Sequence, residues 1–133
     1  MRRKTNKSLI NEHTLDIGKF YFYENFIIAE IKENINLNFE SGKQLFQLAQ
    51  DYYKSTIPYV YISNRINSYS VKPTEHYKLE NIFPNFKGYA IVTYDDISFE
   101  VANLEKLFTN RPTCIFKNLD SAIEWVDQIV LPD

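Results

Sequence analysis

Two short apolar runs, residues 59–62 and 90–92, constrain the fold of this 133-residue chain more than any other feature. The first, Tyr-Val-Tyr-Ile, follows a proline and consists of aromatic and β-branched residues, which are typical of strands. The second, Ala-Ile-Val, is apolar at successive positions and therefore on both faces of a strand. Strands of this kind are usually found in a parallel sheet with helices on both sides. The two runs thus predict an α/β fold.

Helices are predicted in four segments: residues 39–54, 74–83, 97–108 and 119–130. In the first segment, apolar side chains are spaced i, i+3, i+4 and i+7. They are Leu45, Leu48, Ala49 and Tyr52. Its N-terminus is either a capping box formed by Ser41 and Gln44 or a cap formed by Asn38.

The third and fourth predicted helices each carry an apolar series at helical spacing. The third series consists of Ile97, Val101, Leu104, Leu107 and Phe108. The fourth consists of Leu119, Ala122, Ile123, Val126 and Ile129 or Val130. Ser98 is the candidate cap of the third helix, and either Asn118 or Asp120 caps the fourth.

Two further β-rich segments precede the first helix. Residues 19–23 and 26–32 are separated by Glu24 and Asn25, which predicts an antiparallel hairpin. A last short strand is predicted at residues 113–116. We therefore expect an α/β fold in which an N-terminal β-hairpin is followed by alternating helices and strands. Its sheet is mixed but mainly parallel, with about five strands and about four helices.

The length and composition indicate one domain. Residues 1–15 are expected to form a flexible basic N-terminal tail, and residues 16–133 a single α/β domain. No stretch has the roughly 18 apolar residues of a membrane span, and no secretory signal follows Met1, so we expect a cytoplasmic protein. The single cysteine, Cys114, excludes an intramolecular disulfide. A net charge of -2 gives no general attraction to nucleic acid.

Polar residues follow the predicted strands at their carboxyl ends, where open parallel sheets collect their binding groups. After residues 59–62 this set comprises Asn64, Arg65, Asn67, Ser68, Tyr69 and Ser70. After the next strand it comprises Asp95 and Asp96, and after the last strand Lys117 and Asn118. We expect the binding or interaction site at this edge of the sheet.

No catalytic signature is present, so neither an enzymatic activity nor a cofactor is predicted. His13 and His76 each stand without a second ligand at metal-binding spacing, and no metal site is predicted. Cys114 lies within an apolar run, where it is expected to pack as a small hydrophobic side chain.

Two polar groups remain open to more than one interpretation. Asp95 and Asp96 form either a turn with a helix cap or a carboxylate pair able to bind Mg²⁺. Arg65, with Ser68 and Ser70, either belongs to a polar loop that satisfies its own backbone or binds or receives a phosphate.

The segment from residue 19 to residue 130 resembles the STAS superfamily, the sulfate transporter and anti-sigma-factor antagonist domain, and especially its small stand-alone bacterial members. The matching features are the hairpin KFYFYENFIIAEIK, the strand PYVYI before a serine-containing loop, the strand GYAIVTY and the closing CIFKNLDSAIEWV. The resemblance implies a non-enzymatic regulatory or protein-interaction module with a protein partner. In antagonist members a serine after the third strand is phosphorylated by a kinase. Ser68 or Ser70 occupies that place here, without the usual neighbouring aspartate and glycine.

The alternative function is the binding of a small apolar or anionic, lipid-like ligand, which the aromatic richness of the chain would suit. The walls of such a pocket would be Tyr59, Tyr61, Tyr69 and Tyr77, with Arg65 or Lys72 as the anchor. The sequence also leaves a homodimer open.

Overall fold

The computed structural model describes residues 4–71 and 85–131. Its main strands are β1 Asn11–Leu15, β2 Gly18–Phe22, β3 Phe26–Ile31, β5 Tyr59–Asn64, β7 Phe86–Val92 and β8 Thr113–Phe116. The helices in these residues are α1 Lys43–Tyr53, α3 Asp96–Glu105, which continues into the 3-10 turn η2 Lys106–Phe108, and α4 Leu119–Val130. The helix predicted at residues 74–83 lies outside the described residues.

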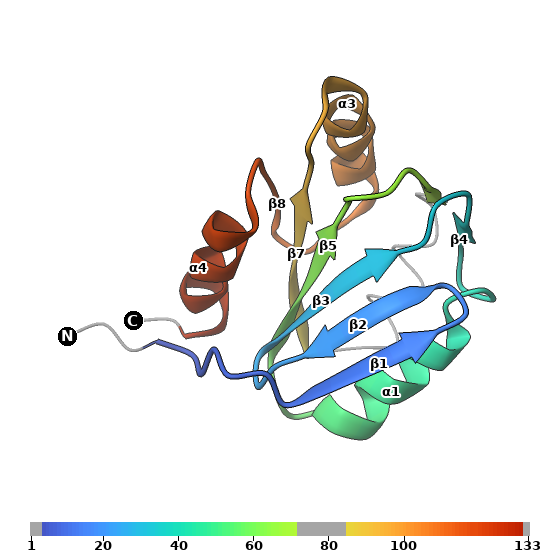
Figure 1. Ribbon diagram of the computed structural model, residues 1–133. Helices are drawn as coiled ribbons and strands as arrows, with labels where there is room; N and C mark the ends of the chain where they lie inside the picture. Colours follow the sequence, from blue (N-terminus) through green and yellow to red (C-terminus); the bar gives the residue numbers. More distant parts are fainter. Residues whose placement is uncertain (1–3, 72–84, 132–133) are drawn as a thin grey trace.

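The main strands form one six-stranded sheet in the order β1-β2-β3-β5-β7-β8 (Figure 1). β2 pairs antiparallel with β1 and with β3, and the pairs β3-β5, β5-β7 and β7-β8 are parallel. The predicted fold class is therefore confirmed, with six strands in this sheet instead of about five. β5, which contains the first apolar run of the sequence, lies in the interior of the sheet between β3 and β7.

The predicted hairpin is β2-β3, and it turns at Glu24 and Asn25. The backbone N–H of Tyr23 donates to the carbonyl oxygen of Phe26 at 2.9 Å, which closes the turn. The side-chain Nδ2 of Asn25 donates to the carbonyl oxygen of Pro58 at 2.9 Å. Asn25 thus connects the hairpin to the segment that enters β5.

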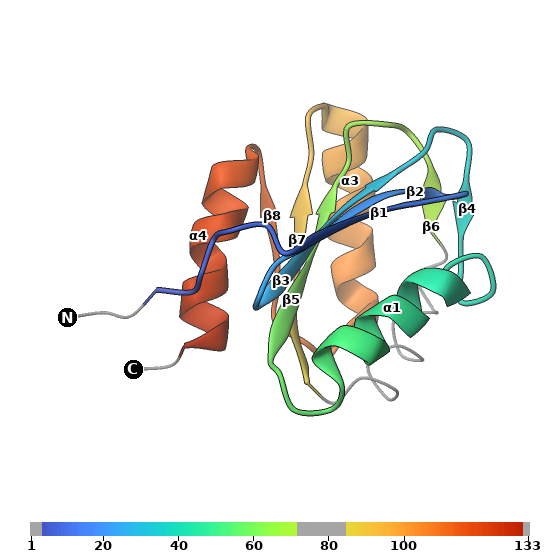
Figure 2. The same cartoon turned by 60° about the horizontal axis from the view of Figure 1, so that its bottom comes forward.

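Helices cover the two faces of the sheet unequally. Figure 2 shows α4 on one side of the sheet and α1 with α3 on the other. Under α1 and α3 lies a cluster that includes Phe20, Phe22, Leu45, Tyr53 and Ile91. Under α4 lies a second cluster that includes Phe26, Val60, Ile62, Ala122 and Val126. Because successive residues of β5 point to opposite faces, its apolar run contributes to both clusters.

The N-termini of α1 and α4 can be compared with the caps predicted from the sequence. α1 has Gly42 at its N-cap without a side-chain hydrogen bond, so the capping box of Ser41 and Gln44 is wrong. Instead, the Oδ1 of Asn38 accepts from the backbone N–H of Ser41 at 3.0 Å, and the Oγ of Ser41 accepts from the N–H of Asn38 at 2.9 Å. This reciprocal pair stabilises the turn that precedes the helix. At α4, the prediction of Asn118 as a cap is confirmed, since its Oδ1 accepts from the N–H of Ser121 at 2.8 Å.

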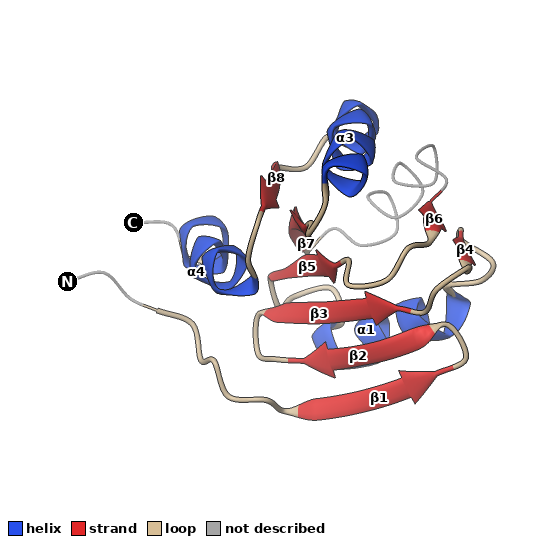
Figure 3. Ribbon diagram, turned by 45° about the horizontal axis from the view of Figure 1, so that its top comes forward, coloured by secondary structure: helices blue, strands red, loops and turns tan. Residues whose placement is uncertain are grey.

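A small second sheet was not predicted. It consists of β4 Asn36–Leu37 and β6 Ser70–Val71, which pair in parallel beside the main sheet (Figure 3). Strands of two residues leave no periodicity in a sequence, and only the tertiary structure brings the two segments together.

The N-terminal segment corrects the predicted domain boundary. Residues 11–15, which we assigned to a flexible tail, form the edge strand β1 along β2. Residues before β1 are also bound to the domain, because Asp127 of α4 accepts hydrogen bonds from the N–H and Oγ1 of Thr5 and from the Nζ of Lys7. β1 is held through its backbone and is largely exposed, so its sequence lacks the apolar alternation that reveals a half-buried strand.

Among residues 4–71 and 85–131, each helix is too short or too polar to pass through a lipid bilayer.

Replacing Asp127 with asparagine should lower the free energy of unfolding at pH 7 by about 1.5 kcal/mol, because a charged hydrogen-bond acceptor is lost. Burial alone would raise the pKa of Asp127, but the hydrogen bonds from Lys7 and Thr5 outweigh it and leave the pKa below its ordinary value of 3.8. This contribution to stability is present above pH 3.8 and is lost as the pH falls through the depressed folded-state pKa. Urea unfolding at pH 7 and pH 3 should therefore show a difference between the two proteins that shrinks at pH 3. The exposed Asp120→Asn on the same helix is the control, and an equal effect there would contradict the assignment.

Candidate functional site

The last residue of β5 and the first residue of the loop that follows it are buried, whereas the next loop residues are exposed. Asn64 and Arg65 are buried, whereas Ile66, Asn67 and Ser68 are exposed. The loop is fixed by hydrogen bonds at several points. The N–H of Arg65 donates to the carbonyl oxygen of Val92 at 3.0 Å, and the Nδ2 of Asn67 donates to that of Ile31 at 3.1 Å. The loop therefore has a defined shape at the carboxyl edge of the sheet.

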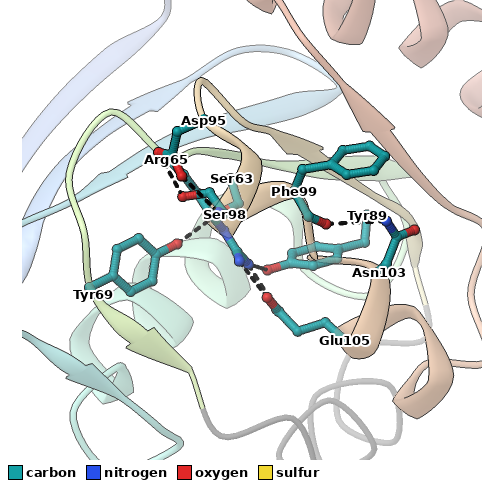
Figure 4. A network of polar contacts seen from close by, with 9 residues as sticks. All are labelled: Ser63, Arg65, Tyr69, Tyr89, Asp95, Ser98, Phe99, Asn103 and Glu105. Carbon is teal, nitrogen blue, oxygen red and sulfur yellow. Dashed lines mark hydrogen bonds and ion pairs between the residues drawn. The ribbon is translucent and has the colours of Figure 1, made fainter. Parts of the chain in front are cut away.

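Arg65 lies at the centre of a buried polar network (Figure 4). Its Nη1 and Nη2 form a bidentate ion pair with the carboxylate of Glu105 on α3, with 2.8 Å between Nη2 and Oε1. Nη2 also donates to the hydroxyl of Tyr89 at 3.1 Å, and Nε donates to the Oγ of Ser63 at 3.0 Å. The side chains of Arg65 and Glu105 are 6% and 1% exposed. The guanidinium is thus occupied inside the protein and is not presented to an external anion.

Tyr69, at the end of the loop, also contacts this network. Its hydroxyl is 2.7 Å from the Oγ of Ser63, and the guanidinium carbon of Arg65 lies 5.5 Å from the centre of its ring. Burial raises the pKa of Tyr69 above its ordinary value, although Arg65 and Ser63 partly oppose this effect. Burial alone would lower the pKa of Arg65, but the oxygen atoms of Tyr89, Tyr69 and Glu105 raise it well above its ordinary value. Arg65 therefore stays charged at neutral pH.

The side chain of Asn64 points to the face of the sheet opposite to that of Ser63, because neighbouring residues of a strand alternate between faces. Its Nδ2 donates to the Oε2 of Glu30 at 2.9 Å, and its Oδ1 accepts from the hydroxyl of Tyr94 at 2.6 Å. Burial and the nearby carboxylate of Glu30 raise the pKa of Tyr94, which therefore remains a hydrogen-bond donor at neutral pH. Glu30 and Tyr94 extend the predicted site, and no local pattern identifies Glu30 in the sequence.

Ser68 and Ser70 differ in their surroundings. The carbonyl oxygen of Ser68 accepts from the N–H of Asn34 at 2.9 Å, and its side chain is exposed. Ser70 belongs to β6, and its Oγ lies 3.3 Å from the Oδ1 of Asn36 on β4. Of the two candidate serines, Ser70 is therefore tied into a strand pair, and Ser68 lies in the loop.

Asp95 and Asp96 begin α3. The Oδ1 of Asp95 accepts from the N–H of Ser98 at 2.8 Å, and its Oδ2 accepts from the Oγ of Ser98 at 3.0 Å. Asp95 is therefore the N-cap, and the prediction that Ser98 caps this helix is wrong. The backbone hydrogen bond from Ser98, followed by that from its hydroxyl, lowers the pKa of Asp95. Over residues 4–71 and 85–131, no three His, Cys, Asp or Glu side chains are grouped as a metal ion would require.

The side of α3 that packs against the sheet is not the side that carries the apolar series found in the sequence. Its buried residues are Ala102 and Glu105. Four members of the series are exposed: Ile97 (76%), Val101 (43%), Leu104 (60%) and Leu107 (73%). Because Glu105 must face inward to pair with Arg65, the apolar series is directed away from the core.

Three apolar side chains at the carboxyl edge are largely exposed: Ile66 after β5, Tyr94 after β7, and Ile97 in the first turn of α3. β5 and β7 are hydrogen-bonded neighbours whose register pairs Asn64 with Val92, so Ile66 and Tyr94 each follow a paired residue by two positions. We call the residues Ile66, Asn67, Ser68, Tyr94, Asp95 and Asp96 the edge surface.

The aromatic residues assigned to a ligand pocket have other neighbours. Tyr59 is buried, and its ring stacks on that of Tyr53 with 4.2 Å between their centres. Tyr61 stacks on Tyr89 at 5.5 Å. Tyr59 therefore fills the core between α1 and the sheet. Tyr77 and Lys72, also assigned to this pocket, lie outside the described residues.

The fold is that of a known class of α/β domain, as a comparison with solved structures shows. It is similar to the crystal structure of an uncharacterised DUF3478-family protein with a SpoIIAA-like fold from Shewanella loihica PV-4, with a TM-score of 0.52 and 13% sequence identity. The match covers 87% of this chain and 90% of that chain. No protein-family model matches the sequence, and no curated protein matches it. The STAS-like fold that the sequence resemblance implied is thus confirmed.

Proposed function

We propose that this STAS-like domain is a non-enzymatic interaction module whose edge surface binds a protein partner. The observation that carries the proposal is the exposure of Ile66 and Tyr94 on a hydrogen-bonded scaffold at the carboxyl edge of the sheet. Exposed apolar side chains beside polar ones are typical of protein contact sites. A cytoplasmic location, which belongs to this proposal, suits a chain whose single cysteine forms no internal disulfide.

A binding role fits the edge better than catalysis because its polar groups already have structural tasks. Arg65 is neutralised by Glu105, Asn64 bonds to Glu30 and Tyr94, and Asp95 caps α3. A general acid or base must be within hydrogen-bond reach of a substrate proton. The titratable groups of this network are instead committed to one another.

A photo-crosslinking residue placed at position 66 of the full chain should capture a discrete partner in a lysate of the source organism. The same species should be captured from position 94, because the two positions follow the ends of the adjacent strands β5 and β7. Mass spectrometry would identify it. The control position is 9, where Leu9 is 49% exposed but lies before β1.

With the probe at position 66, Tyr94→Asp should reduce the crosslinked species at least tenfold, because it places a charge in an apolar contact. Leu9→Asp should leave the species unchanged. Equal capture from positions 9 and 66, or no effect of Tyr94→Asp, would place the contact elsewhere.

A further inference from the structure

The exposed apolar series of α3 continues from the edge surface along the helix. Its members, Ile97, Val101, Leu104 and Leu107, are spaced by three or four residues and so lie along one side of the helix. We call these four residues the α3 stripe. Single exposed apolar residues are ordinary, but a continuous row over two turns and the following 3-10 turn is unusual on a protein surface.

The stripe is presented by a helix with a fixed orientation. Ala102 is fully buried against the core, and Glu105 is held by Arg65 from the loop after β5. The cap at Asp95 fixes the other end. Rotation of α3 to bury the stripe would leave the guanidinium of Arg65 without its carboxylate in the interior, which is strongly unfavourable. The ion pair therefore favours the orientation of α3 in which the stripe is exposed.

Negative charge accompanies the stripe. Asp95, Asp96 and Glu100 are exposed on the same helix or at its cap, and residues 88–105 contain no lysine or arginine. Within residues 4–71 and 85–131, the two ion pairs seen are Lys7–Asp127 and Arg65–Glu105. Asp96 and Glu100 therefore take part in neither of these pairs.

We propose that the α3 stripe binds a basic amphipathic helix of a partner protein. An apolar row at i, i+4 and i+7 is the form in which helices are recognised by a partner surface, and the carboxylates at its border select lysine and arginine on the incoming helix. The inference rests on the proposed interaction function and specifies the chemistry of the partner. Ile97 adjoins the edge surface, so one partner can contact both areas.

A second copy of this chain is a poorer occupant. Pairing two α3 helices would bring Asp96 and Glu100 of both copies into one interface, with Lys106 as the first basic residue that follows them in the sequence. Like charges opposed across an interface disfavour association. The charge pattern thus favours a basic partner over self-association.

The test uses the purified full chain and a fluorescein-labelled, 14-residue amphipathic peptide made of leucine and lysine. Fluorescence anisotropy should show binding that weakens at least tenfold between low and high salt, as expected for a contact assisted by charge. Leu104→Glu should weaken binding at least tenfold. The matched control Leu9→Glu changes an equally apolar exposed residue outside α3 and should have no effect. Thermal unfolding would verify that both variants fold.

Each other outcome contradicts the inference. If a leucine–glutamate peptide binds with the same affinity as the leucine–lysine peptide, the carboxylates beside the stripe do not select a basic partner. If Leu104→Glu binds the leucine–lysine peptide with unchanged affinity, the stripe is not the binding site. A dimer in light scattering that Leu104→Glu dissociates would assign the stripe to a second copy. If the peptide does not bind but positions 66 and 94 still crosslink a partner, this inference is refuted and the proposed interaction function stands. If positions 66 and 94 capture no partner, the proposed interaction function itself is refuted.

Discussion

Replacement of Glu105 with alanine should lower the free energy of unfolding by about 3–5 kcal/mol, the cost of leaving one member of a buried ion pair without its partner. The guanidinium of Arg65 would keep its bond to Ser63 and its contact with Tyr89 but would lose both bonds to the carboxylate. Because Arg65 stays charged, it cannot avoid the penalty by losing its proton. Urea unfolding followed by circular dichroism measures the change.

The double variant Arg65→Met with Glu105→Leu separates the charge from the packing. It removes both charges and keeps apolar volume at both positions, so it should be more stable than Glu105→Ala alone. Asp96→Ala is the matched control for an exposed carboxylate on the same helix and should change the stability by less than about 0.5 kcal/mol. If the double variant is as unstable as the single one, the ion pair is not the source of the effect.

Tyr53→Ala should be about equally damaging, with a loss of about 3–5 kcal/mol, because it empties a large aromatic site in the core. The side chain is fully buried, and its ring stacks between Phe22 and Tyr59. Its hydroxyl donates to the carbonyl oxygens of Tyr23 at 2.6 Å and Phe26 at 2.9 Å, so it also fixes the turn of the β2-β3 hairpin. Thermal and urea unfolding should both detect the loss.

Two comparisons divide this effect into its parts. Tyr53→Phe keeps the ring and removes the hydroxyl, and should cost about 1–3 kcal/mol. Tyr52→Ala changes the adjacent, half-buried tyrosine and should cost less than Tyr53→Ala. A Tyr53→Phe loss as large as that of Tyr53→Ala would show that the hydroxyl, and not the filled volume, holds this part of the core.

The order of most strands and helices follows from local patterns. The hairpin, the buried runs in β5 and β7, the last strand and the helix after Asn118 were all predicted, because burial on one or two faces leaves a period that a short segment records. The edge strand β1 and the two-residue strands β4 and β6 were missed because their backbones pair without a buried apolar face. For the N-terminus of α1 the sequence left two alternatives, and the capping box of Ser41 and Gln44 is wrong because Ser41 bonds to Asn38 in the turn before the helix.

The candidate site was only partly accessible from the sequence. The loop from Asn64 to Ser70 and the start of α3 do lie at the carboxyl edge, since parallel strands end on the same side. The role of Arg65 was not predictable, because its partner Glu105 lies 40 residues away and neither residue carries a local signal. In the sequence Ile66 is one apolar residue within a polar loop, and only its exposure in the structure makes it part of the edge surface.

The sequence by itself determined the fold class, since alternating apolar periods of two and 3.6 residues are local properties that the chain must satisfy wherever its segments pack. It also determined that α3 would be amphipathic. Only the tertiary structure decided which side of α3 faces inward: it places Ala102 and Glu105 against the core, pairs Glu105 with Arg65, and leaves Ile97, Leu104 and Leu107 exposed. The physical reason is that the inward side of a helix depends on its partners in the fold, and the carboxylate that the buried Arg65 requires stands on a different side of α3 from most of its apolar series.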